Sequence, residues 1–162
     1  MIFGSQRDWG LFTSINRELL SSVVEQEILF YKLSLEYTPA NMYGEATERI
    51  YWSPLKLNCL IVRGDQTTTT DDFGPDVQRA TNFNLLRQDC LDADLEPEIG
   101  DIVCWSENYF EVTNVNENQL FLGKDQNYTL TEYGPNFGAS ISLLLTTHLT
   151  RADRVAITRT RL

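Results

Sequence analysis

Few residues of this 162-residue chain are of the types that perform catalysis. His148 is the single histidine, and Arg151 and Asp153 lie close to it in the sequence. A histidine so placed could act as a general base or as one metal ligand. One histidine excludes the multi-histidine metal sites of soluble enzymes. We therefore interpret His148 as a histidine at the end of a strand or at an interface, and keep the base or ligand as the alternative.

The three cysteines, Cys59, Cys90 and Cys104, are odd in number, widely spaced and without a C-x-x-C motif. This pattern predicts reduced thiols in an intracellular protein, not a disulfide framework. Cys59 and Cys104 fall inside predicted strands, which indicates small buried hydrophobic residues. The alternative is a nucleophile paired with His148 in space, which no local motif supports.

An acidic stretch at 89–98 is the remaining candidate for metal binding. Asp92, Asp94 and Glu96 have the spacing of positions 1, 3 and 5 of a calcium loop. Position 6 is Pro97, where that loop needs glycine, and position 12 is Val103, where it needs glutamate. We interpret the stretch as a solvated acidic turn. The sequence holds no paired-carboxylate or Ser/His/Asp motif, so we expect no enzymatic activity, no cofactor and no metal.

The charge of the chain is strongly asymmetric. Thirteen basic and 23 acidic residues give a net charge of −10. Residues 151–162 contain four arginines and one aspartate, a net of +3, so residues 1–150 carry −13. An acidic body argues against a general nucleic-acid-binding surface, because phosphate backbones favour lysine and arginine. No apolar run approaches the roughly 20 residues that a membrane helix needs.

The elements that must position these residues are mostly short strands. Apolar residues at helical spacing, Ile15, Leu19, Leu20, Val23 and Val24, predict a helix over 14–27 with one apolar face. A period of two predicts a strand at 28–37, and 50–62 is a further strand broken near Pro54. The other predicted strands are 79–86, 102–105, 109–115, 119–122, 127–130 and 139–149, with a short helical turn after residue 86.

Three segments have little to bury. We expect residues 1–10 to form a loose arm and residues 151–162 to form a basic tail. Residues 64–78, with four threonines and four aspartates, predict an exposed, mobile loop. The chain is thus expected to be a single, mainly β domain over 1–162. Its core is a small β-barrel or sandwich of about six to eight short strands, with one N-terminal helix.

The three segments and the aromatic and arginine content indicate an assembly protein. Tyrosine, tryptophan and arginine are the residue types enriched at protein interfaces. The chain has seven tyrosines, three tryptophans and ten arginines, against only three lysines. Each segment could become ordered on a neighbour. The interface candidates are Trp9, Phe12, Phe73, Arg151, Arg154, Arg159 and Arg161.

Several motifs resemble one family. They are Tyr43-Gly44-Glu45, Phe73-Gly74-Pro75-Asp76, PEIGDIVCWSENYFEVTNV at 97–115, QLFLGKDQNY at 119–128, YGPNF at 133–137 and HLTRADR at 148–154. In these the chain resembles the neck, or head-closure, proteins of large contractile-tailed bacteriophages, especially those that infect cyanobacteria. The 97–115 hairpin motif also recurs in unrelated small β-barrels, so the combination is the more specific signal.

The resemblance implies a structural subunit of the virion neck, assembled in the host cytoplasm. Such a subunit forms a six- or twelve-fold ring, closes the head after DNA packaging and joins it to the tail. Its partners would be copies of itself, portal and adaptor proteins, and tail-terminator proteins, with DNA passing through without specific binding. A tail-terminator or tail-completion ring subunit is the alternative within the virion. A small β-barrel enzyme that binds a ligand or metal is the alternative of another class.

Overall fold

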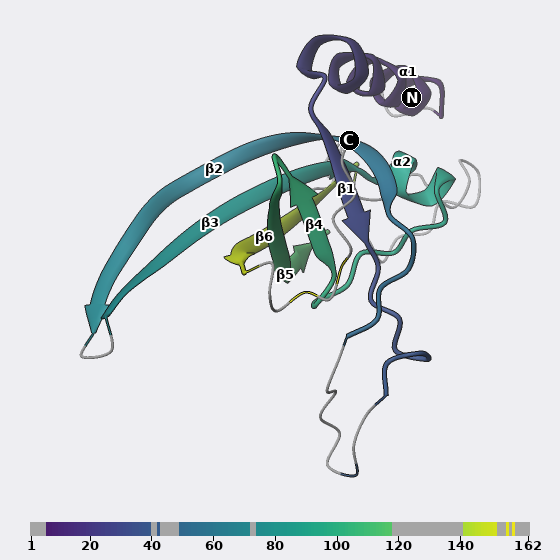
Figure 1. Ribbon diagram of the computed structural model, residues 1–162. Coiled ribbons are helices and arrows are strands. Elements are labelled where there is room, and N and C mark those ends of the chain that lie inside the picture. The colour runs from purple at the N-terminus through teal and green to yellow at the C-terminus, as the bar shows by residue number, and fades with distance from the viewer. Residues whose placement is uncertain are drawn as a thin grey trace.

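In the part of the chain that the structure describes, six antiparallel strands form the body of the molecule. The computed structural model describes residues 6–39, 42, 49–71, 74–117, 141–151, 155 and 157. Its elements are α1 (Gln6–Glu18), the π-helical η1 (Leu19–Val24), β1 (Glu27–Tyr31), β2 (Leu55–Asp71), β3 (Gly74–Leu86), α2 (Arg87–Asp92), β4 (Ile102–Trp105), β5 (Asn108–Asn116) and β6 (Ser142–Thr150). The strands close into a barrel in the order β1-β2-β3-β6-β5-β4 (Figure 1). The predicted mainly β fold, with a small barrel and an N-terminal helix, is confirmed.

Alternating apolar residues of each strand fill the barrel. In β1, Ile28 and Phe30 belong to the interior, whereas Leu29 belongs to a cluster on the outer face. Residues two apart in a strand share a face, so a period of two in the sequence becomes a core. Phe83 and Phe110 meet edge to face, with ring centroids 5.5 Å apart. The other buried members of this core are Leu57, Cys59, Leu85, Cys90, Leu95, Val103, Val112, Leu143 and Leu145.

A second apolar cluster covers the outside of the barrel over β1 and β4, and it includes part of the expected tail. Val155 is buried in this cluster, and Ile157 and Tyr51 pack against it. The remaining buried members are Leu29, Tyr31, Ile102, Cys104 and Tyr109. The expectation that all of 151–162 is a tail outside the fold is therefore wrong at Val155 and Ile157. These two side chains pack against the barrel because the outer face of β1 and β4 is itself apolar.

The expected loop at 64–78 is instead the outer part of a long hairpin, so that prediction is wrong. β2 and β3 pair from Cys59–Leu85 to Asp71–Gly74, with a register shift between Arg63 and Gln66. Figure 1 shows both strands curving well beyond the barrel. We call residues 66–71 and 74–79 the β2/β3 arm. Its four threonines favour extended backbone because they are branched at Cβ, a preference that a polar composition hides.

Gly64 permits the close approach of the two strands at the base of the β2/β3 arm. A Cβ atom at this position would lie 2.9 Å from the carbonyl oxygen of Ala80. Real Cβ atoms do not come so close to backbone, so any other residue would force the strands apart at the register shift. Gly64, at the start of the expected loop, therefore marks an irregularity inside a strand.

The N-terminal elements differ from the prediction in their boundaries. α1 begins at Gln6 instead of near residue 14, so the loose arm predicted at 1–10 is wrong for residues 6–10. The helix ends in the π-helical turn η1, after which Glu25 takes a left-handed φ of 48°. β1 ends at Tyr31, earlier than the predicted strand at 28–37. The helix and the strand are thus both present where their periods predict them, but their ends differ from the predicted ones.

Other predictions agree with the structure. The hairpin expected at 102–105 and 109–115 is β4 and β5, and the strand expected at 139–149 is β6. β2 begins directly after Pro54, because proline cannot donate a ladder hydrogen bond. α2 is the expected helical turn. The strand pair predicted at 119–122 and 127–130 lies outside the described residues.

Candidate functional site

His148 takes part in an ionic cluster on the barrel surface. It lies on β6, and its Nε2 atom is 3.9 Å from the Glu111 carboxylate on β5. Arg49 donates a hydrogen bond of 2.8 Å to the same carboxylate. The Arg49 and His148 side chains are both about half exposed. In this arrangement the Glu111 carboxylate lies between the two side chains, so His148 lies beside a surface ion pair of Arg49 and Glu111.

The three cysteines are buried and free, as the sequence predicted. Burial raises the pKa of Cys59 to about 12, and burial is also the main cause that raises the pKa of Cys90 to about 12. The pKa of Cys104 is raised as well, mainly by burial. Because the thiolate is the nucleophile and the metal-binding form, a raised pKa disfavours both roles near neutral pH.

The acidic stretch at 89–98 contributes two aspartates that hold α1. Arg17 of α1 donates hydrogen bonds of 2.6 Å to Asp89 and to Asp92 of α2. Gln88 also donates to Asp92, and the bonds from Gln88 and Arg17 lower the pKa of that carboxyl group. In the described part of the chain, no group of three or more His, Cys, Asp or Glu residues is placed to hold a metal ion.

An open depression of about 340 Å³ lies beside α2. Its lining combines apolar residues, among them Leu95 and Leu143, with charged ones. Arg87 and Glu117 of this lining form an ion pair of 3.5 Å. Among the residues that the structure describes, the lining includes no histidine, serine or tyrosine, and its carboxylates and the buried Cys90 are the candidate acids and nucleophiles.

The interface candidates of the sequence are only partly placed by the structure. Trp9 and Phe12 belong to α1, where Phe12 is 39% exposed. Arg151 is exposed directly after β6. The other four candidates, Phe73, Arg154, Arg159 and Arg161, lie outside the described residues. The structure therefore brings Trp9 and Phe12 together on one helix and leaves the grouping of the arginines as a prediction.

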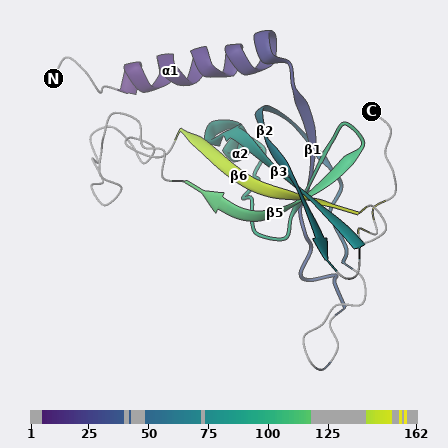
Figure 2. The ribbon, with the colours of Figure 1, turned by 90° about the vertical axis from the view of Figure 1, so that its left-hand side faces the viewer.

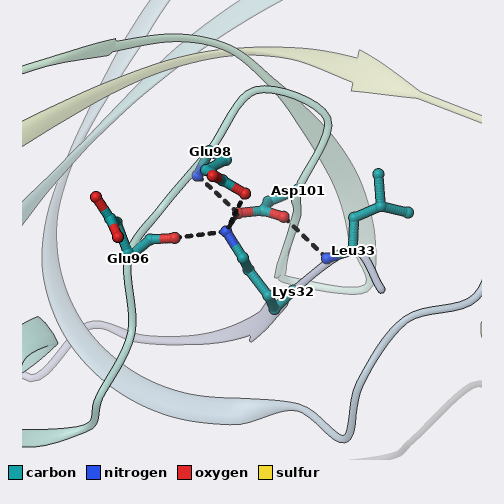
Figure 3. A network of polar contacts seen from close by, with 5 residues as sticks. All are labelled: Lys32, Leu33, Glu96, Glu98 and Asp101. Carbon is teal, nitrogen blue, oxygen red and sulfur yellow. Dashed lines mark hydrogen bonds and ion pairs between the residues drawn. The ribbon is translucent and has the colours of Figure 1, made fainter. Parts of the chain in front are cut away.

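A charged network that the sequence did not reveal joins β1 to the loop before β4 (Figure 3). The Asp101 side chain is 1% exposed. Its carboxylate accepts hydrogen bonds from the backbone N–H groups of Leu33, at 2.9 Å, and Glu98, at 2.8 Å. Lys32 reaches it at 3.4 Å and donates bonds of 2.6 Å to the Glu96 carbonyl and the Glu98 carboxylate. We call this network the Asp101 clip.

The Asp101 clip ties the end of β1 to the turn before β4. The backbone of the same residue also bonds to β5, because the Val112 N–H donates to the Asp101 carbonyl at 2.9 Å. One aspartate thus fixes the end of β1, the 98–101 turn and β5 where β1 and β4 close the barrel. The only sequence signal was the Gly100-Asp101 pair, and Gly100 has a φ of 95° that suits a turn.

The pH dependence of stability tests the burial of Asp101. Desolvation raises its pKa, opposed by the backbone hydrogen bonds and by Lys32. A pKa that is higher in the folded state means that folding favours the protonated acid. The contribution of Asp101 is then fully present below the ordinary aspartate pKa and declines as pH rises through the raised one. We therefore expect the advantage of wild type over Asp101→Asn in unfolding free energy to shrink as pH rises from the ordinary aspartate pKa through the raised one.

Denaturant unfolding at a series of pH values from acid to neutral measures that difference. Glu98→Gln is the control, because Glu98 is 62% exposed in its ion pair with the same lysine. A wild-type advantage over Asp101→Asn that grows with pH across the window would contradict the direction of the shift.

The geometry defines a class of protein, a small closed β-barrel that carries a projecting hairpin and a surface-anchored helix. A scan of protein-family models gives no match to the sequence, and a search of curated proteins gives none. None of the helices in the described ranges is long and apolar enough to cross a membrane.

Proposed function

We propose that the protein is a structural ring subunit of a phage neck that closes the head and joins it to the tail. The observation that carries this proposal is the β2/β3 arm, which continues past the barrel as two paired strands (Figure 1). An isolated two-stranded hairpin is only marginally stable in water. Such an arm gains stability when a neighbouring subunit packs against it, and this favours an assembly.

Ring geometry and charge support the same proposal. A cyclic ring uses heterologous interfaces, in which a projecting element of one subunit docks on a different patch of the next. A net charge of −10 suits a protein around a DNA channel, because carboxylates repel phosphates and let DNA pass without being held. The protein would then need no cofactor and no catalytic residue, and its location would be the neck of the virion.

The direct test is assembly on a template. Purified protein is mixed with portal–adaptor complexes, or with isolated tails, of a contractile-tailed phage, and mass by light scattering is combined with negative-stain imaging. We expect rings at the portal end. A labelled subunit at the tail end would instead identify a tail-terminator. A protein that stays monomeric and joins neither complex would contradict both.

Removal of the β2/β3 arm is expected to separate assembly from folding. In the variant, residues 65–79 are replaced by Asn-Gly, which joins Gly64 to Ala80 in a short hairpin. The paired residues Val62–Asn82 and Arg63–Thr81 are retained, so the barrel should fold with little loss of stability. Ring formation on the template should be lost. Circular dichroism and thermal unfolding check the fold, and a shortened variant that still forms rings would show that the arm is not an assembly element.

A further inference from the structure

One face of the N-terminal helix is apolar and open to solvent. Leu11, Ile15, Leu19 and Val23 recur every four residues along α1 and η1, and their exposed fractions are 56, 52, 48 and 72%. Residues four apart on a helix are neighbours on one face. We call these four residues the α1 stripe. The sequence predicted one apolar face that also contained Leu20 and Val24, but these two are partly buried instead.

The polar side of the same helix is fixed to the body of the protein. With 3.6 residues per turn, Arg17 lies on the far side of α1 from Ile15. Its ion pairs with Asp89 and Asp92 hold that side near α2. η1 lies against β2, and Figure 2 shows α1 running above the barrel as a separate layer. The contacts therefore direct the α1 stripe away from α2.

The exposed, apolar α1 stripe is expected to contact a partner. A contiguous exposed apolar patch on a folded protein marks an interaction site. An amphipathic helix recognised through residues at four-residue spacing ordinarily lies in an apolar groove. The charges near the stripe indicate the rim of that groove, because Glu18 is exposed on the helix and Glu25 is exposed at its end.

We propose that α1 and η1 dock in an apolar groove, rimmed by lysine and arginine side chains, on a different protein. Charge complementarity selects this occupant. A second copy that paired stripe to stripe would bring Glu18 and Glu25 against the same two carboxylates, and the net charge of −10 would be repelled by an anionic lipid surface. The proposal does not rest on the neck function, because it concerns only the chemistry of the surface that fits the helix.

A designed peptide provides the complementary chemistry for a test. The probe is a labelled helical peptide of leucine and lysine, with leucines every three or four residues, and its match has glutamate in place of lysine. Binding to the full chain is followed by fluorescence anisotropy. We expect the Leu–Lys peptide to bind at least tenfold more tightly than the Leu–Glu peptide. Ile15→Gln with Leu19→Gln should weaken that binding at least tenfold, since glutamine keeps helix propensity.

The matched control is Leu35→Gln with Ile99→Gln. These two side chains are 76 and 69% exposed and lie outside the helix. This control should bind the Leu–Lys peptide like wild type, and circular dichroism confirms that each variant folds. Equal affinity for both peptides, or equal loss in both double variants, would overturn the proposal.

Two further measurements distinguish the other occupants. Sedimentation at increasing protein concentration would reveal self-association, and self-association that the stripe variant abolishes would assign the α1 stripe to a second copy. Flotation with zwitterionic and anionic vesicles that depends on the stripe would assign it to a lipid surface. Either result would overturn the proposal, and neither bears on whether the arm supports a ring. Failure of ring assembly would likewise leave the peptide result unchanged.

Discussion

Replacement of Asp101 by alanine is expected to lower the free energy of unfolding by about 2–4 kcal/mol, because it leaves two partly buried backbone donors without their charged acceptor. The Leu33 and Glu98 N–H groups both lose the carboxylate. Lys32 keeps its bonds to the Glu96 carbonyl and to the exposed Glu98 carboxylate. The loss therefore comes mainly from the two backbone donors at the closure of the barrel. Denaturant unfolding followed by tryptophan fluorescence measures it.

Two variants serve as controls for this substitution. Glu98→Gln removes the exposed partner of Lys32 and should cost less than about 1 kcal/mol, as exposed ion pairs do. Asp101→Asn retains one oxygen acceptor, but its amide NH₂ faces a donor. Its loss of unfolding free energy should therefore lie between those of Glu98→Gln and Asp101→Ala. A loss in Asp101→Ala no larger than that in Glu98→Gln would mean that the clip does not hold the barrel closed.

Ending the chain after Thr150 is expected to lower the free energy of unfolding by about 2–4 kcal/mol, the range for burying one large and one partly covered apolar side chain. Val155 is 6% exposed against the outer face of β1 and β4, and Ile157 packs beside it. Their removal also exposes apolar residues of those strands, such as Leu29 and Cys104. Thermal and denaturant unfolding of the truncated chain measure the effect.

A second truncation isolates the two apolar residues. A chain that ends after Ile157 keeps both of them and loses only residues 158–162, which include Arg159 and Arg161. This variant should retain wild-type stability, and it tests whether the last two arginines serve assembly. If the two truncations unfold at the same denaturant concentration, the packing of Val155 contributes nothing measurable. In that case the whole tail would lie outside the fold, as the sequence first suggested.

The arm and the α1 stripe place two projecting features on one small barrel. The β2/β3 arm is polar in composition, and the stripe is apolar with acids nearby. These chemistries suit different contacts, so loss of one need not abolish the other. Assembly assays on arm-deleted and stripe variants can therefore be interpreted separately, provided that each variant folds.

The sequence by itself determined the features that depend on neighbouring residues. A period of two located β1, and a helical period located α1 and η1. The hairpin predicted at 102–105 and 109–115 is β4 and β5. Pro54 set the start of β2 because proline lacks the ladder donor. The buried, free cysteines also followed from the strands that contain Cys59 and Cys104. In each case the deciding interaction spans only a few residues.

Only the tertiary structure decided which faces and segments find partners. Threonines at 67–70 became strand because β3 pairs with them, and Val155 became core because β1 and β4 present an apolar outer face. Arg17 turned the apolar side of α1 outward by binding aspartates 72 and 75 residues away. Asp101 joined segments about 68 residues apart. These contacts join residues that are far apart in the sequence, so no local pattern of residue types predicts them.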